Sequence, residues 1–515
     1  MMIQSKQYNF NVSIGELLYW LFFGLLFWAK GIGLYDGQPM FKTIMVAAVL
    51  CLMGKFAVEK YSIKELISVG VIVLLSAFTY ITSGDKGLLL YCLMLVGMKN
   101  VNTKYLLRFA LFVWGISFVI LWLVSWTHME STMYRVAEKL GLGHIFRWSM
   151  GYAHPNVLHI TYLILAALIL LAVGERLNWK WYLSLVIGNI FVFLFSVSYT
   201  GVAIVFLLLI GRCYLQFRKN ISALEKALIG MVFPGCVLLS LLAPIVLRGK
   251  MFALLDKALN TRLTLAKYYL KPECISLFGK RLSEITNARL TMDNSYVFGL
   301  IGYGIIPFLG LCMMYGFLIY HCLKHGKMTE LLVILILAVA GLTEPFMFNT
   351  AFKNIAFLFV GEAMFESLRI RQVKEIGIWY RRNREIHVPV DKVVKTWHTI
   401  TAYMKEQKRL LQAGVLVGIV AAVIVGFLFV NLPEGYVVAR VHCEDISEDI
   451  VLYEEGASEY EGFRLMENFE SGNEIEYFSG DIVLMERIRV ISMSALLGGL
   501  LGGMIFLFGM RLLRR

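Results

Sequence analysis

The segment of residues 248–294 is rich in cationic side chains and lies between two long apolar stretches. It holds nine cations (Arg248, Lys250, Lys257, Arg262, Lys267, Lys271, Lys280, Arg281 and Arg289) and four acids (Asp256, Glu273, Glu284 and Asp293). Arginine offers a planar fork that binds two phosphate oxygens, and lysine acts as a point charge. Arg262 and Arg281, with Lys280 beside the latter, therefore predict a site for a diphosphate.

A second group of polar residues stands at the start of an apolar stretch that lies earlier in the chain. His154 and Asn156 flank Pro155, a residue that suits the first turn of a helix because its missing N–H costs nothing there. Side chains held there, at the outer membrane boundary, are candidates for a functional site. A polar cap at a membrane boundary explains the same residues without chemistry, and the sequence leaves both explanations open.

Two acids also stand at ends of apolar segments. Asp293 and Asn294 precede the segment that begins at residue 295, and Glu344 lies near the end of another. A carboxylate is costly in hydrocarbon and indicates function by default, although a helix cap is an equally good explanation of Asp293. Asp293, beside the basic loop, is thus an acid or base candidate, and Glu344 is a candidate functional residue.

Other kinds of chemistry find no support in the sequence. The nine histidines are dispersed, and no spacing of His, Cys, Asp or Glu typical of a metal site is present. There is no glycine-rich nucleotide-binding loop either. We therefore expect no metal and no cofactor. The net charge of +13 predicts basic cytoplasmic loops and no nucleic-acid partner.

The composition identifies the elements that must position these residues. Hydrophobic residues make up 58% of the chain and charged residues 17%, against about 25% charged in ordinary soluble domains. Apolar runs near the roughly 20 residues of a membrane span recur along the chain, which predicts an all-α polytopic membrane protein. We expect spans at 14–33, 40–57, 65–83, 86–98, 105–126, 157–173, 182–196, 201–211, 228–247, 295–320, 330–348, 352–368, 410–431 and 491–510.

Lysine and arginine predict the orientation of these roughly fourteen spans. Their clusters in short loops all fall on one side, together with the segment 369–408 and both termini, and that side should be cytoplasmic. The loops 128–156, 248–294 and 432–490 and the turn at 196–199 should then face outward. A basic outer loop breaks the usual placement of positive charge, and an anionic ligand is the obvious reason.

The chain should divide into three parts. Residues 1–368 form a body of about twelve spans that contains the loop 248–294. Residues 369–408 are a basic cytoplasmic linker suited to anionic lipid head groups. Residues 409–515 are a module of two spans around an acidic extracytoplasmic domain, 432–490. Alternating residues at 435–442 and 474–485 predict strands in that domain.

The order of these motifs resembles the O-antigen polymerase and ligase superfamily of bacterial membrane glycosyltransferases. The resemblance is closest to its polysaccharide repeat-unit polymerases, often called Wzy, and covers roughly residues 10–370. The motifs that carry it are Gly151–Asn156, Ser198-Tyr199-Thr200-Gly201, Asn260–Arg262, Leu277–Gly279, Asp293–Tyr296, the span containing Gly304, and Thr343-Glu344-Pro345.

The resemblance implies a metal-independent enzyme of the bacterial cytoplasmic membrane that works on the extracytoplasmic face. Such an enzyme polymerises oligosaccharide repeat units carried on polyprenyl diphosphate into O-antigen, capsule or exopolysaccharide. Arg262 would stabilise the departing diphosphate with Arg281 or Lys280 assisting, and His154 or Asp293 would act on the acceptor hydroxyl. Asn156, Asn294, Glu344 and Tyr199 would contact substrate. Partners would be the lipid-linked donor and acceptor, membrane lipids, and a chain-length regulator or flippase.

Two departures from the family pattern matter. Tyr199 stands where many members have arginine, so one expected cation is absent. Asp293-Asn294 stands where ligase-type members tend to have His-Asn, which favours a polymerase. A ligase that moves a finished glycan, or a transporter or flippase of the same lipid-linked sugar, remains an alternative. The part from about residue 409 onward is only loosely similar to chain-length co-polymerases, and a regulatory role for it is a hypothesis.

Overall fold

The structure is a computed structural model of the 515-residue chain. It describes residues 9–127, 134–139, 143–218, 220–259, 261–281, 292–369, 375–389, 396, 399, 402–403, 405–430, 440–443, 462–465, 473–478 and 480–513. Asn260 and Arg289 of the basic loop lie outside the described residues, as does most of the predicted acidic domain, including Glu444, Asp445 and Glu448.

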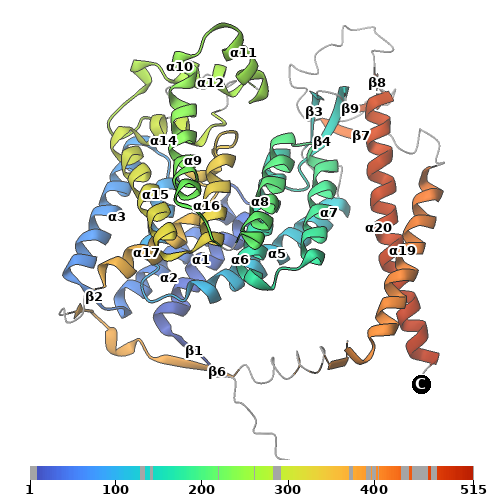
Figure 1. The fold of residues 1–515 in the computed structure, drawn as a ribbon, viewed down its shortest axis with the longest axis horizontal. Helices are drawn as coiled ribbons and strands as arrows, with labels where there is room; N and C mark the ends of the chain where they lie inside the picture. Colours follow the sequence, from blue (N-terminus) through green and yellow to red (C-terminus); the bar gives the residue numbers. More distant parts are fainter. Residues whose placement is uncertain are drawn as a thin grey trace, which may run out of the picture.

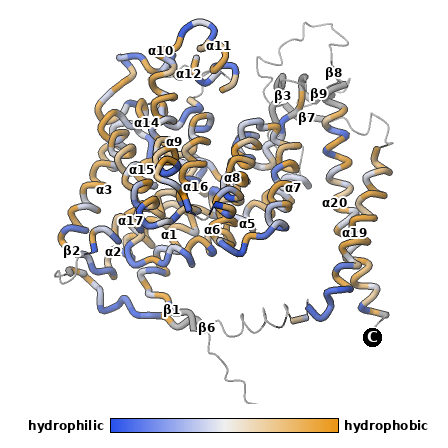
Figure 2. The backbone as a smooth tube through the Cα atoms, viewed as in Figure 1, coloured by the Kyte–Doolittle hydropathy of each residue, from blue (hydrophilic) through white to orange (hydrophobic). Residues whose placement is uncertain are grey.

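Long apolar helices dominate the described residues, and they are orange over most of their length in Figure 2. Eleven are long and apolar enough to cross a membrane. They are α1 (Ile14–Gly31), α2 (Pro39–Val58), α3 (Ile63–Ser83), α5 (Thr103–Thr127), α6 (Pro155–Val173), α7 (Trp179–Ser196), α8 (Tyr199–Phe217), α9 (Ala223–Leu241), α15 (Ile305–His325), α19 (Lys408–Val430) and α20 (Gly480–Leu513). Shorter helices are α4 (Gly87–Val96), α16 (Met328–Ala340) and α17 (Ala356–Leu368). The predicted all-α polytopic membrane protein is confirmed.

Two of the predicted spans are interrupted in the structure. The segment 295–320 was expected to be one span, but it forms α14 (Ser295–Tyr303) and then α15, with a break at Gly304. Gly304 has φ of +86°, and a Cβ there would come within 2.3 Å of the Gly279 nitrogen. The close approach of the loop backbone therefore ends the helix. The segment predicted as 330–348 is helical only to Ala340, and non-helical residues with a short 3-10 turn, η4 (Pro345–Met347), lead into α17.

The two ends of the helices carry different segments (Figure 1). The upper end carries α10 (Ala243–Val246), α11 (Gly249–Ala258), α12 (Arg262–Tyr269), the hairpin of β3 (Tyr134–Lys139) and β4 (Gly143–Trp148), and the sheet β7 (Arg440–Cys443), β9 (Asn473–Phe478), β8 (Gly462–Leu465). The lower end carries β1 (Asn9–Ser13), β2 (Tyr61–Ser62), β5 (Glu375–Ile376), β6 (Glu385–Pro389) and the end of α20. The described parts of the three loops predicted to share one side thus lie at one end. That this end faces out of the cell stays a prediction from charge.

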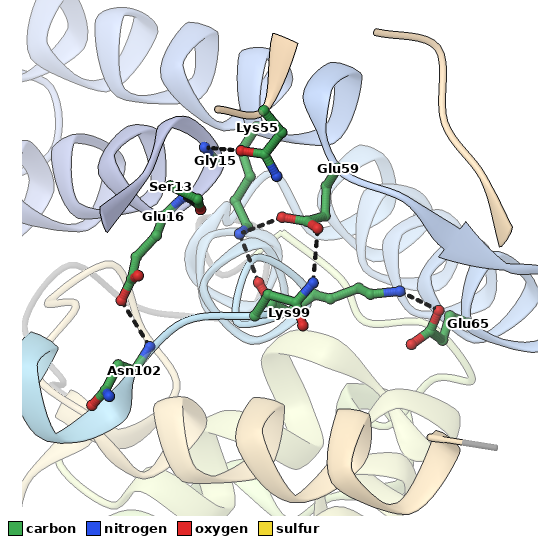
Figure 3. Close-up of polar contacts among 10 residues, drawn as sticks. Ser13, Gly15, Glu16, Lys55, Glu59, Glu65, Lys99 and Asn102 are labelled. Atoms are coloured by element: carbon green, nitrogen blue, oxygen red, sulfur yellow. Dashed lines mark hydrogen bonds and ion pairs between the residues drawn. The ribbon is translucent and has the colours of Figure 1, made fainter. Parts of the chain in front are cut away.

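A buried network of charges holds the lower end together (Figure 3). Lys55 of α2 is fully buried, and its Nζ donates to the Lys99 carbonyl at 2.7 Å and lies 3.7 Å from Glu59. Lys99 pairs with Glu65 of α3 at 2.5 Å, and Asn100 donates to Glu59 at 2.8 Å. Buried charges are tolerated when they are paired and hydrogen-bonded. The network therefore fixes α2 and α3 against the turn that follows α4.

The described part of the basic linker is attached to the same end. Strand β6 pairs antiparallel with β1, and β5 pairs with β2. Between β5 and β6, Trp379 N donates to the Ala57 carbonyl at 2.8 Å, and the Asn383 side chain accepts from Gly15 N at 2.9 Å. Residues 375–389 are therefore a strap across the ends of α1 and α2.

The C-terminal pair of helices packs through glycines. A Cβ at Gly418 of α19 would come within 2.8 Å of the Gly499 carbonyl of α20, so the backbones approach closely there, as in small-residue membrane interfaces. Helix α20 begins at Gly480. Residues 480–485, predicted as strand, are therefore helical, because the strand β9 ends at Phe478 and the chain turns directly into the membrane helix.

Orientation can be tested by cysteine labelling in right-side-out vesicles. The variants are Lys250→Cys in α11 and Arg382→Cys in the strap, each in a chain whose native cysteines are replaced by alanine. Both side chains are exposed, so accessibility is decided by the side of the membrane alone. We expect a membrane-impermeant maleimide to label Lys250→Cys at once and Arg382→Cys only after permeabilisation. The reverse order would invert the topology and place the basic loop in the cytoplasm.

Candidate active site

Arg262 is the first residue of α12, and its side chain turns inward although it lies in a loop. Leu263, Ala266 and Tyr269 of α12 are buried, and Ala266 and Tyr269 pack with Val297 of α14, which seats the short helix on the helices beneath it. Arg262 is 7% exposed. Its Nη2 lies 3.3 Å from the Asp293 carboxylate and 3.3 Å from the Thr343 carbonyl. The arginine therefore joins the basic loop to two other segments.

These two segments also bind each other directly. Ser295 N donates to the Gly341 carbonyl at 2.8 Å, and Asn294 Nδ2 donates to the Leu342 carbonyl at 3.1 Å. The Ser295 hydroxyl donates to the Glu344 carbonyl at 2.6 Å. The side chain of Asn294 also caps α14 by accepting from Tyr296 N and Val297 N. Asn294 is thus a positioning residue that sets the Asp293 segment beside Glu344.

Asn156 connects Glu344 to a second arginine. Its Nδ2 donates to Glu344 Oε1 at 2.7 Å, and its Oδ1 accepts from Arg147 Nη2. Arg147 is 6% exposed, and its Nε donates to the Ser196 carbonyl at 2.9 Å, at the end of α7. Arg147 lies on β4 and was not among the predicted site residues. Its only signal in the sequence is a positive charge in a loop that the topology places outside.

Glu344 is the most buried carboxyl of this group, with 7% exposure. It lies in the non-helical segment between α16 and α17. Burial raises the pKa of Glu344 to about 7, and nearby Asp293 adds to this, while Arg262, the Asn156 hydrogen bond and Arg147 lower the pKa. A carboxyl with a pKa near neutrality can accept and release a proton at physiological pH.

Lys353 is a second site residue that the sequence did not predict. It follows Glu344 in the same interhelical segment and is 3% exposed. Its Nζ donates to the Thr161 hydroxyl at 2.7 Å and to the Val157 carbonyl at 3.4 Å, both on α6. Burial lowers the pKa of Lys353 to about 7, and Lys30 lowers it as well, while Glu344 raises it. The lysine holds the Glu344 segment against α6.

His154 and Tyr199 make contacts typical of helix ends, a cap and a ring-to-ring packing contact. His154 is the N-cap of α6, and its Nδ1 accepts from Asn156 N at 3.1 Å, so it fixes the backbone of the residue that binds Glu344. Tyr199 begins α8, is 39% exposed and packs on Phe193 at 5.7 Å between ring centroids. Arg147 of β4 approaches the turn before Tyr199, where it binds the Ser196 carbonyl.

Lys280 and Arg281 are held at another place. Lys280 Nζ donates to the Glu273 carbonyl at 2.6 Å. Arg281 is exposed, and its side chain lies beside Gly84 at the end of α3. The Thr82 hydroxyl of α3 donates to the Phe278 carbonyl at 2.5 Å and fixes this part of the loop there. The structure therefore gathers Arg262, Asp293, Asn294, Asn156 and Glu344 with Arg147. Lys280 and Arg281 contact Glu273 and the end of α3.

Within the part of the chain that the structure describes, no three His, Cys, Asp or Glu side chains form a group that could hold a metal ion. Comparison with known proteins gives no match: no family model, no curated protein and no solved structure is significantly similar to the chain.

The raised pKa of Glu344 predicts a pH-dependent gain of stability in Glu344→Gln. Because the folded-state pKa of about 7 exceeds the ordinary 4.5, ionisation opposes folding, so wild-type stability falls as pH rises from about 4.5 to about 7. A shift of this size corresponds to about 3 kcal/mol. We expect Glu344→Gln to melt higher than wild type at pH 8 and no higher at pH 5, measured by thermal unfolding in detergent.

Glu273→Gln is the matched control, because Glu273 is an exposed acid of the basic loop and its neutralisation should change neither midpoint. A loss of stability in Glu344→Gln at pH 8 would contradict the assignment. It would mean that the two arginines hold Glu344 charged and depend on that charge.

Proposed function

We propose that the protein is a membrane glycosyltransferase that polymerises oligosaccharide repeat units carried on polyprenyl diphosphate. The observation that carries this proposal is the convergence of two buried arginines and two carboxyls, Arg262, Arg147, Asp293 and Glu344. They come from four separate segments of the chain and lie at the end of the helices that bears the basic loop.

The cost of burying these charges supports a functional origin. A buried ion pair is often no more stabilising than well-packed apolar residues of the same size, so stability alone gives little reason to keep one. Arg262 and Arg147 each present nitrogens toward an acidic or amide group of the site. A diphosphate, which carries oxygens on two adjacent phosphorus atoms, is the kind of anion that two guanidinium forks recognise.

The proposed reaction is a substitution at the anomeric carbon of the donor sugar. The hydroxyl oxygen of the acceptor forms a bond to that carbon while the bond from the carbon to the diphosphate oxygen breaks. The hydroxyl proton passes to a carboxylate, Asp293 or Glu344, and polyprenyl diphosphate leaves with the electron pair. Arg262 stabilises the negative charge that develops on the leaving group, a type of stabilisation that is usually a leading catalytic term.

The carboxylates differ in suitability as the base. Asp293 is a third exposed in its side chain and is paired with Arg262. Glu344 is buried, and its pKa of about 7 matches the operating pH of a general base. The contact of His154 with Asn156 N makes it a cap of α6. We therefore assign the proton transfer to Glu344 before Asp293, and we assign His154 a positioning role.

A transfer assay with purified protein tests the proposal. The donor and acceptor are a synthetic polyprenyl-diphosphate oligosaccharide, a chelator is present, and products are separated by gel or mass spectrometry. We expect a ladder of multiples of the repeat unit. Arg262→Ala should lower the turnover rate by about 100-fold or more, because removing one donor to developing charge costs that much. Arg262→Lys should recover only part of the rate because lysine lacks the fork.

Lys250→Ala is the matched control, since Lys250 is an exposed cation of the same loop; its turnover should stay within about twofold of wild type. A ladder that survives Arg262→Ala would refute the assignment of Arg262. A single product formed only with a second acceptor would identify a ligase. Movement of the lipid-linked sugar between leaflets without any bond formation would identify a transporter.

A further inference from the structure

Helix α20 of the C-terminal pair contacts the strand that bears Arg147. Its contacts in the body of the molecule are with β4 and α7, and Figure 1 shows the start of α20 at the upper end, near the strands there. Met485 of α20 forms a small apolar cluster with Ile145 of β4 and Val197 at the end of α7, and all three side chains are buried. The C-terminal pair is therefore in direct contact with the elements of the site.

A buried ion pair begins at the residue after Met485 on α20. Glu486 and Arg489 are three residues apart, on one face of the helix, and are 5% and 2% exposed. Glu486 Oε1 also accepts from Trp148 Nε1 of β4 at 3.2 Å. Arg489 Nε donates to the Leu194 carbonyl in the last turn of α7, and its guanidinium lies 5.9 Å from the centre of the Phe195 ring. The pair thus holds β4 with one member and α7 with the other.

The same two elements fix Arg147. Trp148 follows Arg147 directly, and successive side chains of a strand point to opposite faces. While Trp148 reaches Glu486, Arg147 reaches Asn156 and the Ser196 carbonyl. Arg489 and Arg147 therefore bind carbonyls two residues apart in the last turn of α7, where helical carbonyls lack intrahelical partners. A shift of α20 would move both supports of Arg147.

We propose that α20 positions Arg147, so that the C-terminal pair of helices is a working part of the site and its Glu486–Arg489 pair sets the orientation of the strand β4. The inference rests on the proposed function, because it gives Arg147 a role at the diphosphate. If α20 only packed against β4 and α7, the apolar cluster of Met485 would be enough and no buried ion pair would be needed. An ion pair with directed bonds to two elements fixes their relative orientation, which apolar packing does less well.

A double-mutant cycle tests this coupling. Glu486→Ala removes the acceptor of Trp148 and the partner of Arg489, and we expect turnover in the full-length protein to fall about tenfold. Arg147→Ala should lower turnover about 100-fold. If α20 acts through Arg147, the double variant should be no slower than Arg147→Ala. Glu486→Gln, whose amide oxygen can still accept from Trp148, should recover part of the loss, and Leu484→Ala on the exposed face of α20 should stay near wild type.

Binding of undecaprenyl diphosphate to the same variants, measured by native mass spectrometry, gives a second readout that needs no transfer. We expect Glu486→Ala to weaken binding about tenfold in the presence of Arg147 and not in its absence. Melting temperatures of all variants show whether a loss reflects unfolding.

Losses that multiply in the double variant, or an unchanged Glu486→Ala, would overturn the inference. If the effects of Glu486 and Arg147 on diphosphate binding are coupled but no transfer occurs, the proposed glycosyltransferase activity is refuted and the positioning role of α20 stands. Absence of both transfer and diphosphate binding in the wild type would refute both.

Discussion

The arrangement depends on one constraint, the placement of the Arg262 guanidinium away from bulk water. An arginine keeps its charge in proteins, so burial to 7% exposure requires partners from the surrounding chain. Asp293 and the Thr343 carbonyl are such partners, and they belong to the start of α14 and the segment after α16. The partners of this one side chain therefore draw together the basic loop and two interrupted apolar segments. Glu344, next to Thr343, accepts a hydrogen bond from Asn156, and Asn156 in turn binds Arg147.

Charge is distributed differently at the two ends of the helices. At the lower end Lys55, Lys99, Glu59 and Glu65 form a network of ion pairs and hydrogen bonds, which is a structural use of buried charge. At the upper end, arginines converge on a carboxyl whose pKa burial has raised to about 7. When Glu344 is protonated, the positive charge of Arg262 and Arg147 is available to an added anion. The lower network, by contrast, consists of matched lysine and glutamate pairs.

Much of this organisation is predictable from the sequence, because hydrophobic length and the placement of lysine and arginine are local properties. They predicted the helical fold. The cations of the loop 248–294 made Arg262 a candidate, and polar residues at span ends made Asp293, Asn156 and Glu344 candidates. Long-range contacts were not predictable. Arg147 is recognisable only once β4 folds back onto Asn156 and Ser196, and the break at Gly304 comes from the approach of Gly279. The helical start of α20 was missed because Gly480-Asp481-Ile482-Val483 alternates like a strand.

The most direct test of the central claim is a cryo-electron microscopy map of the protein with a non-transferable polyprenyl-diphosphate sugar analogue. The account predicts density for the two phosphates between the guanidinium groups of Arg262 and Arg147, with the sugar directed toward Glu344 and Asp293. Diphosphate density beside Arg281 and Gly84, or at the lower end of the helices, with the Arg262–Arg147 site unchanged, would contradict it.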